Sequence, residues 1–565
     1  MKLKNIILLG TVATTMLASC GDEMDYHEYS TYDKEYVFNN FDNTVGFVTN
    51  IYSYLSYDYG VVGNGMLASA CDEAEFSWRS NQIHNFTNGS LSASNTPSFF
   101  GLYGGIREAN YFLANHANCD FSDYKLNKDY ENQMVRFNRL PYEVRLLRAY
   151  FYFQLVSYYG DVPFYTDVIS EDEATALGRT PAAEVLDFVL KECDEVAPEL
   201  PISYATLSND AAAGETGRVN RIAALALKAR AALYKASPLF NTANDKELYH
   251  KAALAAQDVI DMCAANGIKL GSYEANWGTD NWQNSETIFA RRIGDLNWLE
   301  SANYPMGVEN GNGGNCPTQT LVDAYDMKST GLAWDEEGSG YNAEKPYDNR
   351  DPRLGKTIAV NGEKKWPQYN ANALETYYGG ANGLPTQGAT PTGYYLKKLL
   401  DGSVNVSSVG SNSKRHSWII FRLGEFYLNY AEAAFRYLGS ADATSQDLKM
   451  SAREALNVTR TRSGVAMPAF PEGMSNADFW TKYGKERMVE LAFEGHRYFD
   501  VRRWKEGAEH ANIVEMKITK NPDGSLTYKR QTVKRTWDDK LYFLPIPHSE
   551  MMKHSNPDFK QNPGY

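Results

Sequence analysis

The sequence predicts a mainly α-helical protein in which helical hairpins carry a large, irregular, loop-rich layer and a few short strands. The chain has 565 residues, of which 43% are hydrophobic and 22% charged, so it is long and apolar enough to bury a large core. Apolar residues recur at spacings of three and four through residues 41–266 and again through residues 414–565. Between residues 267 and 413 this period fades, and tryptophans lie among Gly, Asn, Asp and Pro.

The N-terminus has the features of an export signal. Lys2 and Lys4 precede an uncharged run over residues 6–18, which is too short for a bilayer core that needs about 20 apolar residues. Leu17-Ala18-Ser19-Cys20 resembles the bacterial lipobox, in which the cysteine carries lipid. We therefore expect a lipoprotein signal peptide over residues 1–19 and lipidation of Cys20. The alternative is an ordinary secretory signal.

The mature chain is expected to have two parts. Residues 20–40, rich in Asp, Glu and Tyr, predict a lipid-bearing tether, and residues 41–565 predict one domain. Removal of residues 1–19 deletes two lysines, so the formal net charge of −14 becomes −16. A nucleic-acid partner would need a basic surface, so this charge argues against one. The membrane contact is expected through the lipid alone.

The first part of the domain, residues 41–266, predicts successive amphipathic helices. Residues 144–158 carry two apolar stripes, so we expect this helix to be buried on several sides. The sequence Gly160-Asp161-Val162-Pro163 is expected to end it. Thr180 and Pro181 then supply an N-cap and a first-turn proline for the next helix.

Two more helices are expected in this half, over residues 222–234 and 248–262. The second should stop at Asn266-Gly267, where glycine can adopt the left-handed conformation of a helix end. Short loops between alanine-rich helices favour hairpins stacked as a solenoid, in the manner of tetratricopeptide repeats.

The helical pattern returns after the loop-rich layer of residues 267–413. Helices are expected over residues 423–438, 452–463 and 481–494. In and just after the last of these regions, Arg487, Glu490, Glu494 and Arg497 are separated by about one helical turn or by the end of the helix. This spacing predicts ion pairing among them in a helix packing seam. The layer is therefore an excursion within one domain, and residues 414–565 form its C-terminal helices and terminal segment.

Several sequence blocks are spread over nearly the whole chain. They are Leu102-Tyr103-Gly104-Gly105-Ile106-Arg107-Glu108-Ala109-Asn110, Leu147-Arg148-Ala149-Tyr150-Phe151-Tyr152, Gly160-Asp161-Val162-Pro163, Arg422-Leu423-Gly424-Glu425, Glu494-Gly495-His496-Arg497-Tyr498-Phe499-Asp500, Leu544-Pro545-Ile546-Pro547 and Asn562-Pro563-Gly564-Tyr565. Together they resemble the SusD/RagB family of outer-membrane, glycan-binding lipoproteins. The resemblance implies a SusD-like fold exposed at the cell surface. It also implies that the protein lies as a lid over a SusC-like TonB-dependent transporter and delivers an oligo- or polysaccharide to it.

Two loop segments have the composition of a sugar-binding site, with aromatic rings for the apolar faces of sugars and planar polar groups for their hydroxyls. One begins near residue 72 and the other runs from residue 277 to residue 304. In each, the competing interpretation is a buried tryptophan that anchors the loop. The expected glycan-binding residues are Asp72, Trp78, Arg79, Asn81, Trp282, Arg291, Trp298 and Tyr304.

Motifs of common enzymes do not occur in the sequence. There is no HExxH or GxSxG, and Gly355-Lys356-Thr357 lacks the earlier glycine of a P-loop because Arg350 stands there. We therefore expect a binding protein without catalytic residues, metal or cofactor. Two alternatives remain: a helical-repeat scaffold that binds only protein, and a surface glycoside hydrolase, which needs only two suitably spaced carboxylates.

Overall fold

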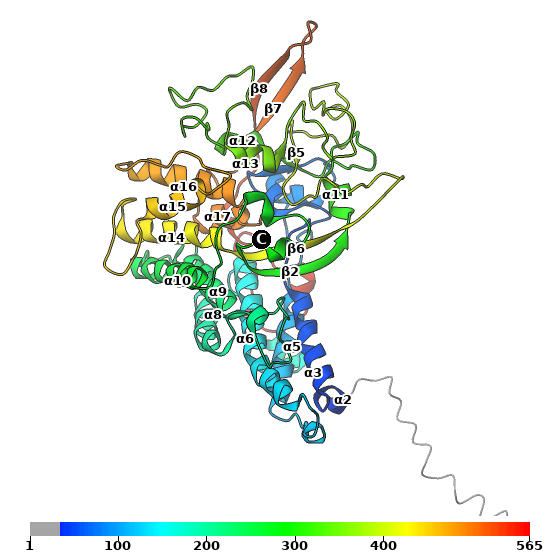
Figure 1. Cartoon of the computed structure of the whole chain (residues 1–565), viewed down its shortest axis with the longest axis vertical. Coiled ribbons are helices and arrows are strands. Elements are labelled where there is room, and N and C mark those ends of the chain that lie inside the picture. The colour runs from blue at the N-terminus through cyan, green and yellow to red at the C-terminus, as the bar shows by residue number, and fades with distance from the viewer. Residues whose placement is uncertain (1–33) are drawn as a thin grey trace, which may run out of the picture.

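The computed structural model describes residues 34–565, and the predictions for the signal peptide and for Cys20 lie outside the described residues. A body of packed helices occupies one side of the molecule (Figure 1). Loops, short helices and strand ribbons cover the other side, and one hairpin projects from it. The mainly helical fold with few strands is thus confirmed.

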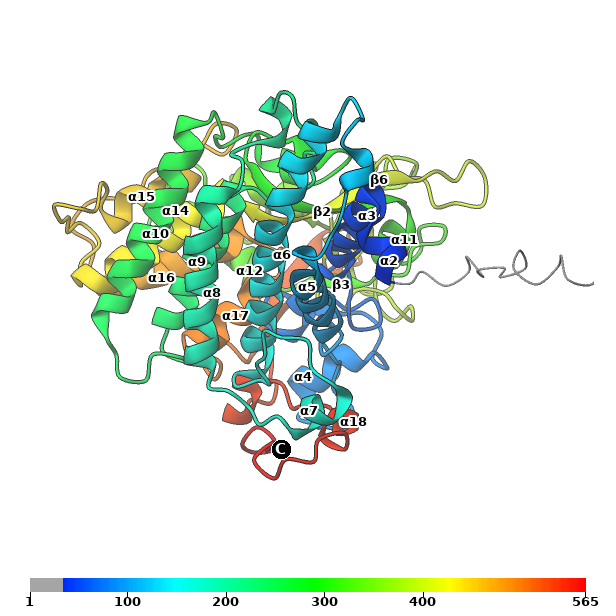
Figure 2. The same ribbon diagram turned by 90° about the horizontal axis from the view of Figure 1, so that it is seen from below.

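The helical body is built from neighbouring helices that pack in chain order. Each of α5, α6, α8, α9 and α10 contacts the next, and α10 then packs against α14 after the intervening layer. Figure 2 shows these helices side by side, as expected for stacked hairpins. The longer helices are α3 (Phe41–Ile51), α5 (Leu102–His116), α6 (Tyr130–Tyr159), α8 (Ala182–Val196), α9 (Arg221–Ala236), α10 (Lys246–Ala265), α14 (Leu423–Leu438), α15 (Ala452–Arg460) and α16 (Asn476–Glu490), and the shorter α2 (Lys34–Phe38) and α17 (Arg497–Arg503) accompany them.

The predicted ends of these helices are largely observed. α6 is buried on several sides and ends at Gly160, whose φ of 72° needs a residue without Cβ. α10 ends before Asn266 and Gly267, as predicted. The expected N-cap Thr180 is wrong by one residue: Pro181 occupies the N-cap position of α8, and the Asp161 side chain accepts from the Ala182 N–H over 2.8 Å. Thr180 instead exchanges backbone hydrogen bonds with Val162.

The strands form four antiparallel ribbons of two strands each within residues 34–565. The ribbon of β2 and β6 crosses above the helical body (Figure 1), and β7 and β8 form the projecting hairpin, which the sequence analysis did not anticipate. The pairs are β1 (Ala74–Phe76) with β3 (Asn315–Pro317), β2 (Thr287–Leu296) with β6 (Lys414–Arg422), β4 (Ile358–Ala359) with β5 (Tyr395–Leu396), and β7 (Ile513–Lys520) with β8 (Leu526–Val533). Short helices in the loops are α4 (Asn85–Asn88), α7 (Glu171–Ala176), α11 (Trp298–Asn303), α12 (Gln319–Ala324), α13 (Pro352–Thr357) and α18 (His548–Met551).

A buried ionic network joins the loop layer to the C-terminal helices. Glu490 of α16 lies 2.8 Å from Arg422, 2.9 Å from Arg462 and 2.9 Å from Arg353. Arg353 comes from α13, within the layer, so these contacts hold the layer against α16. Burial alone would raise the pKa of Glu490, but the three guanidinium groups lower it.

The predicted pairing within residues 487–497 is therefore wrong in its partners. Arg487 pairs with Asp500 at 2.7 Å, and Arg497 pairs with Asp72 at 2.7 Å. All four of these side chains are buried, and a buried charge is stable only when other elements surround it with opposite charge. The side chains are buried and ion-paired as predicted, but their partners come from other elements and not from one helical turn away.

No helix in the described part of the chain combines the length and the apolar character that a membrane crossing requires.

Candidate functional site

Trp78 lies in the loop that follows β1, where its indole joins two distant loops. The pairing of β1 with β3 brings this loop beside residues 304–314. The Trp78 Nε1–H donates a hydrogen bond to the Asn312 carbonyl oxygen over 2.7 Å. Gly388 packs against the ring so closely that a Cβ there would lie 2.6 Å from it. Trp78 is therefore half-buried and held in one orientation.

Trp298 is the first residue of α11, and it is the more accessible of the two tryptophans. Its side chain is 39% exposed. Ser301, three residues later and on the same face of α11, accepts hydrogen bonds on its carbonyl oxygen from the Asn312 backbone N–H over 3.0 Å and from Asn312 Nδ2 over 3.1 Å. Asn312 thus connects the helix of Trp298 to the loop of Trp78.

Arg79 and Asn81 follow Trp78 in the same loop, and we call the group Trp78, Arg79, Asn81, Trp298 and Asn312 the aromatic shelf. The Arg79 side chain is 75% exposed and lies 3.5 Å from Glu75. Asn81 is partly committed to the fold, because its Nδ2 donates to the Gly63 carbonyl over 2.6 Å and its Oδ1 accepts from the Ile83 N–H.

Two of the predicted glycan contacts, Asp72 and Tyr304, are buried instead. Asp72 accepts two hydrogen bonds from Arg497, over 2.9 and 2.7 Å, and although burial would raise its pKa, Arg497 lowers it. The Tyr304 hydroxyl donates to the Asp401 carbonyl over 2.7 Å in the core. The Asp72 carboxylate is held by Arg497 and the Tyr304 ring lies in the core, so neither side chain belongs to the aromatic shelf.

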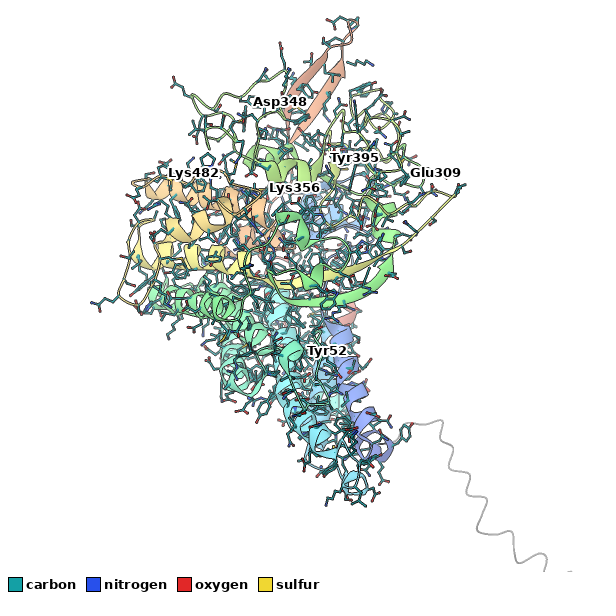
Figure 3. The ribbon with its side chains drawn as sticks, in the orientation of Figure 1. Tyr52, Glu309, Asp348, Lys356, Tyr395 and Lys482 are labelled. Carbon is teal, nitrogen blue, oxygen red and sulfur yellow. The ribbon has the colours of Figure 1, made fainter. Side chains whose placement is uncertain are left out.

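The remaining predicted residues, Trp282 and Arg291, lie in a second place. A pocket of about 560 Å³ opens between η1 (Tyr52–Tyr54), residues 215–218 and β2, and we call it the arginine pocket. Arg291 and Arg292 line it, and the Arg292 guanidinium lies 3.4 Å over the Trp282 ring. Tyr52, on the pocket wall, lies just below β2 in Figure 3.

The structure adds Asn312 and Tyr52, which the sequence analysis did not select. Asn312 stands in the run Asn310-Gly311-Asn312-Gly313-Gly314, where a Cβ on Gly313 would lie 2.2 Å from the Gly388 carbonyl oxygen. That density of Gly and Asn was the available signal of a closely packed, functional loop. Tyr52 carried no such signal, because its position is set by α3.

Comparison with known proteins agrees with this architecture. A model of the SusD family matches residues 271–565, which is more than half of the chain. The chain belongs to the SusD family. A second family model, described as starch-binding and associating with the outer membrane, matches residues 24–233. Together the two models cover this SusD-family protein from residue 24 to its last residue, except for residues 234–270.

Individual relatives show the same extent of similarity. The SusD-like protein P2 of Formosa agariphila is 25% identical over 524 residues, which are 89% of this chain and 86% of that protein. The crystal structure of a SusD-like protein from Bacteroides fragilis is 26% identical, covers 94% of this chain and 98% of its own, and has a TM-score of 0.75. A SusD-like carbohydrate binding protein from the same species has the same fold, with 24% identity, coverage of 93% and 100%, and a TM-score of 0.72.

Proposed function

We propose that this SusD-family protein binds an oligo- or polysaccharide at the aromatic shelf and passes it, uncleaved, to a SusC-like TonB-dependent transporter. In this proposal a lipid on Cys20 holds the protein at the outer face of the outer membrane. The observation that carries the proposal is the link between Trp78 and Trp298 through Asn312. Family membership supports it, because one matching family model is described as starch-binding.

The chemistry of the shelf suits a neutral sugar chain. The C–H face of a sugar ring is apolar and stacks on an indole, whereas its hydroxyls need hydrogen-bond donors and acceptors. Trp298 offers an exposed ring, and Arg79 offers a largely exposed guanidinium, whose partner Glu75 is buried and also contacts Arg535. Because Trp78 is fixed by its hydrogen bond and by Gly388, little side-chain entropy would be lost on binding.

The tether gives the proposed transfer a physical basis. A lipid-anchored chain stays at high local concentration near its membrane partner even when it swings away. A glycan that touches both proteins favours the closed arrangement by its higher affinity for that state.

Titration calorimetry of the mature protein with glycans chosen from an array tests the binding step. We expect Trp298→Ala to weaken binding at least tenfold without loss of helical circular dichroism. Tyr378→Ala is the matched control, since Tyr378 is also an exposed aromatic residue, at 68%, in another loop. Equal affinities of the two variants would place the glycan elsewhere.

Two further measurements test the rest of the proposal. Chromatography of the glycan after incubation with the protein should show no shorter products; their appearance would indicate a glycoside hydrolase. Affinity purification from outer membranes should recover a TonB-dependent transporter. Recovery of that transporter by a protein with no sugar affinity would indicate a scaffold that binds only protein.

A further inference from the structure

The arginine pocket contains two kinds of arginine. Arg218 is paired with acids, since it lies 3.0 Å from Glu143 and also contacts Glu215. Arg291 instead donates to main-chain carbonyl oxygens, that of Ser53 over 2.9 Å and that of Leu55. Within residues 34–565 it forms no ion pair with a carboxylate, so its charge is not matched by one.

Arg292, the next residue of β2, also donates its hydrogen bond to an uncharged group. Its Nη2 donates to the Thr216 hydroxyl over 2.6 Å, and its guanidinium lies over Trp282. In the part of the chain that the structure describes, no acid forms an ion pair with it. Partial burial lowers the pKa of both Arg291 and Arg292 without making either group neutral at pH 7.

The acids near the pocket already have partners of their own. Glu215 lines the pocket but lies between Arg218 and Arg136, and its distance to Arg136 is 2.6 Å. Asp280, close to Arg292, is 3.2 Å from Arg415 of β6. The carbonyls at the end of η1 offset part of the Arg291 charge. The pocket therefore retains an excess of positive charge on a protein whose net charge is −14.

Both guanidinium groups are held by rings as well as by hydrogen bonds. Arg292 lies 3.4 Å over Trp282, and Arg291 lies 4.6 Å over Tyr57. A planar guanidinium fixed in this way recognises carboxylate or sulfate oxygens through paired N–H groups. Tyr52 supplies an aromatic wall on which a sugar ring can rest, because its hydroxyl is turned inward to Glu143.

We propose that the arginine pocket binds the acidic group of a charged sugar, a uronate carboxylate or a sulfate ester, in the glycan that the protein captures. This inference rests on the proposed function and adds a substrate class to it. The pocket is separate from the aromatic shelf, but β2 connects the two places. It carries Arg291 and Arg292, and Trp298 follows its last residue by two positions. One glycan chain with both neutral and acidic units would suit the two places.

Calorimetry with four probes at fixed ionic strength tests the proposal: oligogalacturonate, sulfated dextran oligomers, neutral dextran oligomers and inorganic sulfate. We expect Arg291→Gln/Arg292→Gln to weaken binding of at least one acidic oligomer tenfold or more. Arg107→Gln/Lys251→Gln removes the same two charges from exposed positions on α5 and α10 and should leave that affinity unchanged. The oligomer that responds identifies carboxylate or sulfate as the group bound.

Arg292→Gln alone is a second test variant that keeps Arg291, because the double substitution also removes the contact of Arg291 with η1 and could disturb folding. It should lower acidic-oligomer affinity while the thermal midpoint stays within a few degrees of the parent protein. Three results would overturn the inference: no binding of either acidic oligomer, equal loss in the control variant, or inorganic sulfate binding as tightly as sulfated oligomer. If any one of these results is found while a neutral glycan still binds in a Trp298-dependent manner, the proposed function stands and only the acidic-sugar site is refuted.

Discussion

Arg497 and Asp72 form a buried, two-bonded ion pair although 425 positions separate them in the chain. Arg497 begins α17, and Asp72 lies two residues before β1, whose following loop carries Trp78. The C-terminal helices thereby hold the base of the aromatic shelf. His510, 3.5 Å from Asp72, also faces this pair.

Asp72→Ala should destabilise the fold by about 3–5 kcal/mol, because it leaves the Arg497 guanidinium buried without its carboxylate. Urea denaturation measures the change. Since the Asp72 carboxylate is held by Arg497 and lies outside the shelf, glycan affinity per folded molecule should stay within about twofold of the parent value. A large loss of affinity in a stably folded variant would indicate that Asp72 belongs to the binding site.

Gly388→Ala should disturb the shelf from beneath. Its Cβ would meet the Trp78 ring and Met306 at 2.6 Å, at a φ of +78° that disfavours any side chain. We expect a loss of about 1–3 kcal/mol in unfolding free energy together with weaker glycan binding. Gly484→Ala in α16 is the control: nothing lies within 4 Å of its Cβ, so it should stabilise the helix by about 0.5–1 kcal/mol.

The buried carboxyl group of Asp58 should make the stability of the fold depend on pH. Burial raises its pKa to about 7, whereas an unfolded aspartate titrates near pH 4. Between these values the folded state binds a proton that the unfolded state has released, so this residue's contribution to stability falls as pH rises from 4 to 7. The integrated effect is roughly 4 kcal/mol.

Asp58→Asn removes the charge and keeps an oxygen that can accept the hydrogen bond from the Leu67 N–H. Denaturation of both proteins across this range gives the contribution of Asp58 as a difference. The variant should become progressively more stable than the parent protein as pH increases to 7. A constant difference across the range would contradict the raised pKa.

Glu432 should act with the opposite sign. Burial would raise its pKa, but Arg503 lowers it to about 2. Its contribution to stability is therefore complete above the ordinary glutamate pKa and is lost as pH falls from about 4 toward 2. Glu432→Gln should be destabilised by about 3–5 kcal/mol at pH 7, and by less at pH 2, in the same denaturation series.

Much of the fold could be predicted because local signals decided it. The apolar stripes of α6, the stop at Gly160 and the end of α10 at Asn266-Gly267 depend on residues within a few positions of one another. The family blocks also lie in short segments. The exposed Trp298 and the half-buried Trp78 were identified by composition, and both belong to the proposed shelf.

Tertiary structure alone decided which candidate side chains reach solvent. Asp72 and Tyr304 resembled their neighbours in composition, but Arg497 and the Asp401 carbonyl enclose them from distant parts of the chain. A buried polar group must find a partner, and that partner can stand anywhere in the sequence. Local pattern therefore determined the helices and the aromatic loops, whereas long-range pairing separated the shelf from the arginine pocket and both from the core.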